Sequence, residues 1–225
     1  MNCDRMRYAV LIRWLASPVH PADINKIQGV YSFKPSLPAI GGSEGFGRVV
    51  KTGSAVTRLE QGDKVVVFTK FSPCWADLST VNESDVTKVD QRLIPLQGAS
   101  LMANPTTAWL MLKMSELQRG DWIIQNSANS AVGRAVIEMA KEKGFHTINI
   151  VRDRPDIKDL KADLTKLGAD IVWTEEEVRT EGRVFKERPE VAFNGVGWKS
   201  CLQMSNLLAR DGLLITYGGM SKKAH

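Results

Sequence analysis

The chain has 225 residues, of which 43% are hydrophobic and 24% are charged, proportions typical of a globular protein with one large or two modest domains. No apolar run is long enough to cross a membrane, so we expect no membrane span. The formal net charge of +5 favours an anionic ligand, but the basic residues are interleaved with acidic ones and form no block typical of a nucleic-acid partner.

The cysteines exclude two structural classes. The chain has three cysteines, an odd number, and they are widely spaced and form no C-x-x-C motif: Cys3, Cys74 and Cys201. They therefore predict neither a disulfide framework nor a structural zinc site, and a reducing compartment is the default. The N-terminal segment lacks the apolar core of a signal peptide and is too short and too acidic for an organelle transit peptide.

The first part of the chain predicts a small antiparallel barrel or sandwich over residues 1 to about 90. Short strands separated by turn residues at this spacing are typical of that architecture. A helical turn is expected over 22–27 after Pro21, and a loop with two prolines over 29–38. We expect the strands over 6–15, 44–51 and 64–69.

Residues 96–114 have a helical pattern that is interrupted by Pro105. Proline disrupts a helix interior because it lacks the N–H donor and its ring clashes with the preceding turn. Two helices meeting near Asn104 and Pro105 are therefore expected, and they would join the β-rich part to the segment that follows.

Residues 120–154 predict a strand, a tight turn, a helix and a second strand. The strands are expected over 122–125 and 147–151, and Gly144 is placed to end the helix between them. Such a unit is the first half of a dinucleotide-binding fold, in which a pyrophosphate lies over the helix N-terminus. Of the glycines in the G-x-G-x-x-G motif only Gly133 is present, so an ordinary βαβ crossover explains these residues about equally well.

Arg152, Asp153 and Arg154 follow the second strand of this unit. An acidic residue at that point binds the ribose 2′-hydroxyl of NAD, whereas arginine accommodates the 2′-phosphate of NADP. The alternative is a solvated charge cluster at the end of a strand. Because the two arginines coincide with the βαβ pattern, we favour NADPH binding.

The remaining sequence completes a doubly wound parallel sheet. Further strands are expected over 171–173, 191–194 and 213–217, and a helix over 198–208. Another helix would have Pro155 at its first position and an apolar stripe made of Ile157, Leu160, Leu164 and Leu167. Five strands separated by helices predict an α/β fold with a parallel sheet.

Five stretches carry a resemblance to the medium-chain dehydrogenase/reductase superfamily and, within it, to mitochondrial trans-2-enoyl-CoA reductases. They are residues 22–31, 37–45, 125–133, 151–157 and 216–220. The resemblance covers essentially the whole chain. It implies a partial GroES-like β-barrel catalytic domain over 1–103 and a partial Rossmann NADPH-binding domain over 104–225, with five strands present and the sixth missing.

The resemblance also implies the activity and its residues. It implies NADPH-dependent reduction of trans-2-enoyl thioesters, carried by CoA or acyl-carrier protein, in mitochondrial fatty acid synthesis, by a homodimer. Tyr31 matches the catalytic tyrosine, although by itself it would be taken as a packing residue in its loop. The cofactor contacts would be Asn104, Asn129, Ser130, Ala131, Val132, Arg152, Asp153, Arg154, Tyr217, Gly218, Gly219 and Met220.

Zinc is not expected, although alcohol dehydrogenases of this superfamily need it. A catalytic zinc requires Cys and His ligands, and Ser43 stands before Glu44 with no cysteine near it in the sequence. His20 is interpreted as structural. Two alternatives remain open: a zinc-free NADPH quinone reductase, and a truncated, inactive NADPH-binding isoform.

Overall fold

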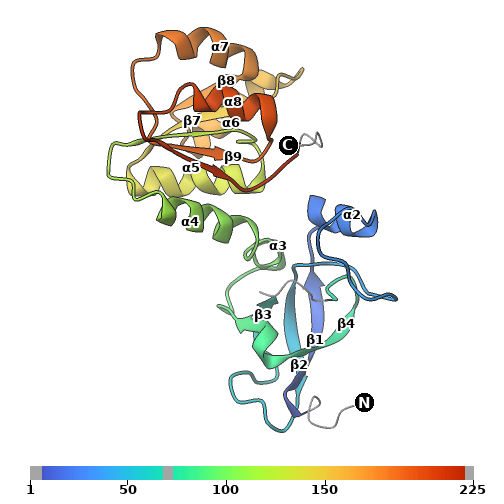
Figure 1. Cartoon of the computed structure of the whole chain (residues 1–225). Coiled ribbons are helices and arrows are strands. Elements are labelled where there is room, and N and C mark those ends of the chain that lie inside the picture. Colours follow the sequence, from blue (N-terminus) through green and yellow to red (C-terminus); the bar gives the residue numbers. More distant parts are fainter. Residues whose placement is uncertain (1–6, 68–72, 221–225) are drawn as a thin grey trace. The chain divides into compact units, whose positions relative to one another are not determined.

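The computed structural model describes residues 7–67 and 73–220, and the chain divides into two compact units, Met1–Ala103 and Asn104–His225. The first unit contains an antiparallel sheet and the second a parallel sheet, each with five strands (Figure 1). Among the described residues, no helix is long and apolar enough to cross a membrane.

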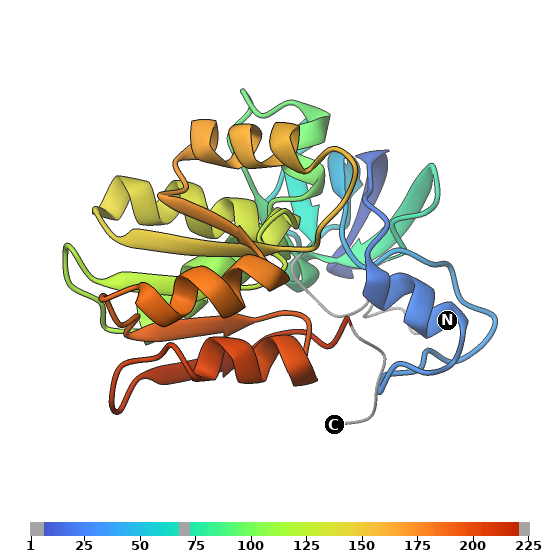
Figure 2. The same ribbon diagram turned by 90° about the horizontal axis from the view of Figure 1, so that it is seen from above.

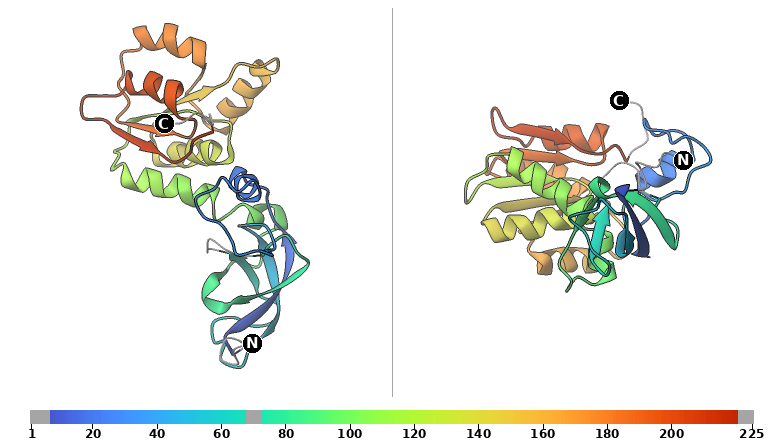
Figure 3. Two further views of the ribbon diagram at one scale, coloured as in Figure 1. Left: turned by 45° about the vertical axis from the view of Figure 1, so that its right-hand side comes forward. Right: turned by 90° about the horizontal axis from the view of Figure 1, so that it is seen from below.

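The first unit is built on the antiparallel sheet (Figures 1 and 3). Its strand order is β4-β1-β2-β3-β5. Along β1, which pairs with β4 and β2, Val10, Ile12 and Trp14 are buried in the core. This alternation is typical of a sheet that packs one face on a core. The strands are β1 (Ala9–Ala16), β2 (Phe46–Thr52), β3 (Lys64–Val67), β4 (Leu78–Asn82) and β5 (Val86–Lys88).

The three strands predicted for this unit are confirmed as β1, β2 and β3, although residues 6, 68 and 69 lie outside the described residues. Strands β4 and β5 were not predicted. β5 has three residues and β4 is mostly polar, so neither shows a clear apolar alternation. A 3₁₀ turn, η1 (Glu83–Asp85), separates them.

The predicted helical turn is α2 (Pro21–Ile27), and the proline-containing segment after it has neither helix nor strand. Two helices are found in the segment around Pro105, α3 (Pro95–Ala99) and α4 (Asn104–Met114), but they do not meet at Pro105: residues 100–103 form turns between them, and Pro105 lies in the first turn of α4. In α3, a Cβ added at Gly98 would lie 2.0 Å from Cδ2 of the buried Phe46. Glycine at this position therefore lets α3 lie directly on the sheet.

The second unit confirms the predicted doubly wound sheet, with strand order β10-β9-β6-β7-β8 and all pairs parallel. The strands are β6 (Trp122–Gln125), β7 (His146–Val151), β8 (Ile171–Thr174), β9 (Val191–Asn194) and β10 (Leu213–Thr216). The helices that connect them are α5 (Ala131–Lys143), α6 (Ile157–Leu167), α7 (Glu175–Val184) and α8 (Trp198–Ser205).

Helices cover both faces of the parallel sheet (Figure 2). Helices α4 and α5 pack with Ile123 and Phe193 on one face, where α6 also packs against α5, while α7 and α8 pack with Ile124 and Ile148 on the other. Neighbouring residues of β6 thus point to opposite faces, as strand geometry requires. Because both faces are covered, the strands are continuous apolar runs, which is why they were predictable.

Three details differ from the sequence prediction. Helix α6 begins at Ile157 rather than Pro155, because residues 155 and 156 form a turn in which Ile157 N–H donates to the Arg154 carbonyl. Helix α8 ends at Ser205 instead of Leu208 and continues as turns. Helix α7 was not predicted, although the capping box of Thr174 and Glu177 marks its start.

A buried carboxylate organises the loops of the first unit. Glu44, 3% exposed, receives hydrogen bonds at Oε1 from the backbone N–H groups of Met102 (2.6 Å) and Ala103 (2.9 Å). Its Oε2 lies 2.5 Å from Nε2 of His20, the residue just before α2. This contact raises the pKa of His20 above its ordinary value of 6.5, against the opposing effect of burial. The charged form of His20 is therefore stabilised by folding.

We predict that the free energy of unfolding depends on pH through His20. Because folding raises the pKa of His20, its contribution is complete below pH 6.5 and is lost as the pH rises through the raised pKa. A hydrogen bond between charged groups contributes about 1.5–3 kcal/mol. Urea unfolding at a series of pH values should show this loss in the wild type and not in His20→Gln. His146→Gln should keep the dependence, and an identical pH profile for wild type and His20→Gln would contradict the prediction.

Candidate functional site

A crevice lies at the carboxyl edge of the parallel sheet. The strand order places the topological switch point between β6 and β9, which is where ligands bind in open α/β sheets. A cavity of about 100 Å³ is found there. Its lining consists of Asn126, Ser127, Asn129, Ser130, Ile150, Val151, Arg152, Glu175, Val196 and Ser200.

The turn between β6 and α5 forms one wall of the crevice. Ser127 has a φ of 55°, which is uncommon for a residue with a side chain and is often found at functional sites. Ser130 caps α5 by accepting a hydrogen bond from Gly133 N–H (3.1 Å). A Cβ at Gly133 would lie 2.5 Å from the Ala128 carbonyl oxygen, so the turn needs glycine there. The N-terminus of α5 thus faces the crevice with its positive dipole end, which suits a phosphate.

A buried amide network holds this turn against the loop after β9. Asn126 Nδ2 donates to Asn194 Oδ1 (2.8 Å) and to Ser200 Oγ (3.0 Å), and Asn126 Oδ1 accepts from Gly195 N–H (2.7 Å). Asn194 Oδ1 also accepts from Gly197 N–H (2.9 Å). Every polar atom of the Asn126 side chain is therefore engaged, which fixes two walls of the crevice relative to each other.

Seven of the twelve predicted cofactor residues lie in the turn before α5, at the start of α5 or directly after β7. Asn129, Ser130 and Arg152 line the crevice. Ala131 and Val132 are the first residues of α5. The remaining two of the charged triplet, Asp153 and Arg154, follow β7 and do not line the cavity.

The segment from Tyr217 to Met220 runs beside the loop after β9. Tyr217 N–H donates to the Asn194 carbonyl (3.0 Å), and Met220 N–H donates to the Gly195 carbonyl (3.2 Å). A Cβ at Gly218 would lie 3.0 Å from the Gly195 carbonyl, so the two segments are in close contact. Burial raises the pKa of the Tyr217 hydroxyl, with Ser130 opposing that rise. The predicted Tyr217–Met220 loop, with Gly219 in it, therefore lies next to the crevice, whereas Asn104 begins α4 and does not line it.

Seven lining residues were not predicted as site residues. They are Asn126, Ser127, Ile150, Val151, Glu175, Val196 and Ser200. Ile150 and Val151 end β7, and the others except Ser200 follow the carboxyl end of a strand within the next few residues. The rule that ligands bind at these ends would have indicated them.

In the first unit, Tyr31 lies just after α2, and 37% of it is exposed. Its backbone N–H donates to the Asn25 carbonyl (3.2 Å), and the Lys26 ammonium lies 5.5 Å from the centroid of its ring. Lys26 also lines a cavity of about 530 Å³ within this unit. Tyr31 is therefore an accessible phenol beside a cation.

Trp75 forms part of the lining of that cavity. Its backbone N–H donates to the Gly41 carbonyl (3.0 Å), and a Cβ at Gly41 or Gly42 would lie 2.6 or 2.7 Å from its ring. The two glycines thus let the indole pack flat on the chain. Together with Ile27, Leu37 and Ile40, Trp75 makes the lining mainly apolar.

Ser43, at the position considered for a zinc ligand, lies in a polar cluster. Its hydroxyl donates to Asp23 Oδ1 and accepts from Lys26 Nζ (2.5 Å). Cys74, distant in sequence, lies close to this cluster, since a Cβ at Gly45 would be 2.9 Å from its Sγ. Burial raises the pKa of Cys74 to about 12, so it is a thiol rather than a thiolate ligand. Within residues 7–67 and 73–220, no group of three or more His, Cys, Asp or Glu side chains is placed to hold a metal ion.

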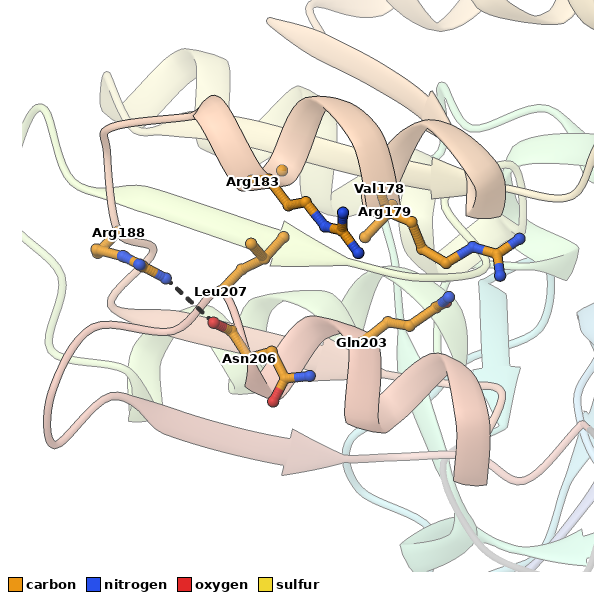
Figure 4. Close-up of a pocket in the computed structure, with 8 residues that line it drawn as sticks. Val178, Arg179, Arg183, Arg188, Gln203, Asn206 and Leu207 are labelled. Atoms are coloured by element: carbon orange, nitrogen blue, oxygen red, sulfur yellow. Dashed lines mark hydrogen bonds between the residues drawn. The ribbon is translucent and has the colours of Figure 1, made fainter.

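A further cavity of about 390 Å³ lies between α7 and α8 (Figure 4). The side chains of Arg179 and Arg183 extend along it, and Arg188 donates from Nη1 to the Asn206 carbonyl (3.1 Å). Its lining is cationic and contains none of the predicted site residues.

Comparison with known proteins identifies the family. Residues 7–98 match the alcohol dehydrogenase GroES-like domain. The chain is 55% identical over 221 residues to a Caenorhabditis elegans protein named mitochondrial enoyl-[acyl-carrier-protein] reductase, covering 96% of this chain and 63% of that protein. The chain thus spans less than two thirds of the length of this relative.

Solved structures agree with this match. The mitochondrial 2-enoyl thioester reductase heterodimer of Candida tropicalis (Etr1p/Etr2p) has a TM-score of 0.90 at 34% identity, covering 99% of this chain and 70% of that one. A complex of Etr1p with NADP and crotonyl-CoA has the same TM-score at 35% identity and the same coverage. A quinone oxidoreductase of Pseudomonas syringae is more distant, with a TM-score of 0.83 at 26% identity, covering 95% of this chain and 66% of that one. The chain belongs to the family of mitochondrial 2-enoyl thioester reductases, within the medium-chain dehydrogenase/reductase superfamily.

Proposed function

We propose that this protein is an NADPH-dependent reductase of trans-2-enoyl thioesters. The observation that carries the proposal is the crevice at the switch point of the parallel sheet, with the N-terminus of α5 on one side and Arg152 on the other. That arrangement suits a phosphate-rich dinucleotide. The proposed domains are a catalytic domain over 1–103, which carries Tyr31, and an NADPH-binding domain over 104–225.

Each predicted residue has a proposed place along the cofactor. Asn129, Ser130 and the first backbone N–H groups of α5, at Ala131 and Val132, would bind the pyrophosphate. Around the 2′-phosphate, Arg152 and Arg154 would supply charge-assisted hydrogen bonds, with Asp153 between them. The nicotinamide end would be bordered by Asn104, Tyr217, Gly218, Gly219 and Met220.

The reaction needs a hydride on the β-carbon and a proton on the α-carbon of the enoyl group. The bound cofactor would supply the hydride. Negative charge then develops on the thioester oxygen and the α-carbon, and a nearby O–H donor stabilises it. The proposed donor is Tyr31, whose phenol is exposed and whose backbone is fixed by the Asn25 carbonyl.

Substrate, assembly and location are inferred from relatives. One relative is named for acyl-carrier protein and another was solved with crotonyl-CoA, so both thioester carriers are proposed as substrates. A dimer is proposed because one relative forms a heterodimer, and the family resemblance favours two identical subunits here. Since several relatives are named as mitochondrial proteins, we propose the same compartment.

Quinone reduction is the second candidate activity, because quinone oxidoreductases share the fold. The closer identity to the enoyl reductases favours the first proposal. An inactive NADPH-binding form is the third candidate, because the crevice that suits a dinucleotide lies in the second unit, whereas Tyr31 lies in the first. Assays with a quinone and with a 2-enoyl-CoA, alongside direct measurement of NADPH binding, separate the three.

We predict that Tyr31→Phe lowers kcat for reduction of a 2-enoyl-CoA by about 10²- to 10⁴-fold, the range typical of a general acid. The phenyl ring keeps the shape of the side chain and removes only the hydroxyl. Oxidation of NADPH followed by its absorbance is the measurement. Tyr8→Phe, which alters another exposed tyrosine of the same unit, should keep full activity, and full activity in Tyr31→Phe would refute the role of Tyr31.

We predict that replacing Arg152 and Arg154 together with alanine removes two charge-assisted hydrogen bonds and weakens NADPH binding by about 10²- to 10⁴-fold. Each charge-assisted hydrogen bond contributes about 1.5–3 kcal/mol, and 1.4 kcal/mol corresponds to a factor of ten. NADH lacks the 2′-phosphate, so its affinity should change little. Calorimetric titration of both cofactors is the measurement, with Arg210→Ala as a control because that side chain is 97% exposed. Equal losses for NADPH and NADH would exclude a 2′-phosphate site.

A further inference from the structure

We propose that Lys26 is a positioning residue for Tyr31, which holds the phenol ring in place and sets a positive charge beside it. This inference rests on the proposed function, because it assigns Lys26 a part in proton donation by Tyr31. The observation behind it is a connected polar chain in the first unit. It runs from the buried Asp23 through Ser43 and Lys26 to the face of Tyr31.

The lysine head group is fixed rather than mobile. Its Nζ lies 2.5 Å from Ser43 Oγ and 4.0 Å from Asp23 Oδ1, and its side chain is only 17% exposed. A lysine on a surface helix normally keeps its ammonium in water. Here the ammonium is directed inward by a carboxylate that is itself 2% exposed.

The buried carboxylate is satisfied mainly by other donors. Asp23 Oδ2 accepts from His20 N–H (3.0 Å), and Asp23 Oδ1 accepts from the Ser43 hydroxyl. Lys26 has three donors, one of which goes to Ser43. The ammonium also lies over the ring of Tyr31, with Nζ 5.5 Å from the ring centroid, which is within the range of a cation–π contact.

The backbone around Tyr31 is held by hydrogen bonds, so only the position of the Tyr31 ring remains to be fixed. The Asn25 carbonyl accepts from Val30 N–H (3.0 Å) and Tyr31 N–H (3.2 Å), and Gly29, with a φ of 70°, makes the turn that allows this. The main chain is therefore anchored to the end of α2. The contact with Lys26 restricts the side chain, whose hydroxyl must reach the substrate.

The charge also matters for the proposed step. When Tyr31 gives its proton, the O–H bond breaks, a C–H bond forms at the α-carbon, and the electron pair of the O–H bond remains on the phenol oxygen. The resulting phenolate attracts the ammonium more strongly than the neutral phenol does. Lys26 therefore stabilises the transition state more than the ground state, which raises kcat rather than lowering KM.

The test is a double-mutant cycle between Lys26→Met and Tyr31→Phe, measured as kcat and KM for a 2-enoyl-CoA with NADPH. We expect Lys26→Met to lower kcat by about tenfold, the effect of a cation–π contact in a partly buried site, and to leave KM within about twofold. Lys26→Arg, which keeps the charge, should restore most of kcat. In the Tyr31→Phe background, Lys26→Met should have no further effect.

The chain offers a matched control. Lys113 lies 5.0 Å from the ring centroid of Trp109 on α4, so Lys113→Met removes a similar contact that is not connected with Tyr31; its kcat should equal that of the wild type. If Lys26→Met fails to fold, as judged by circular dichroism, Lys26→Gln takes its place, since it can still hydrogen-bond Ser43 without the charge.

The outcomes separate this inference from the proposed function. Suppose that the wild type turns over. The inference is then overturned if Lys26→Met has the wild-type kcat, or if the losses in the double variant are additive, and either result leaves the reductase proposal intact. Absence of wild-type turnover would overturn both. A rise in KM with an unchanged kcat in Lys26→Met would assign Lys26 to substrate binding and would also overturn the positioning role.

Discussion

The first unit depends on the buried carboxylate of Glu44. Burying a charge is costly unless it is paired and hydrogen-bonded, and here the partners are two backbone N–H groups after α3 and the side chain of His20. Those contacts fix the end of the loop after α2 and the start of α2 together. Asp23 and Lys26 lie in α2 and Tyr31 lies just after it, so the position of the start of α2 determines where all three lie. The geometry around the candidate catalytic phenol therefore depends on the buried carboxylate of Glu44.

In the second unit, the turn between β6 and α5 leaves the first backbone N–H groups of α5 facing the crevice without most of the glycines of the dinucleotide motif. Ser127 adopts a left-handed φ despite its side chain. Ser130 is the N-cap of α5, at a turn where the dinucleotide motif would have glycines. At Gly133, a Cβ would lie 2.5 Å from the Ala128 carbonyl oxygen. The motif is therefore reduced to the single glycine that steric contact demands, which is why the match to the fingerprint looked weak.

Sequence patterns predicted the doubly wound sheet because its strands are buried on both faces and are continuous apolar runs. They predicted α5 from Gly144 and the apolar spacing, and Arg152 from its place after β7. The short, polar strands β4 and β5 were not predicted, because their hydrogen bonds to neighbouring strands, and not an apolar sequence pattern, make them strands. Contacts between distant residues were out of reach for the same reason: nothing in the sequence brings Cys74 beside Gly45, Ser43 onto Asp23, or Ser200 into the crevice.

The amide network of Asn126, Asn194 and Ser200 has a consequence for how the sheet assembles. Strands β6 and β9 are neighbours in space, although the Asn126 and Asn194 amides that follow or end them are 68 residues apart in sequence. A slip of one residue would turn both amides away from their partners and leave buried donors and acceptors unpaired. The side chains that border the crevice thus also favour the correct alignment of the strands, so the crevice forms only in a correctly assembled sheet.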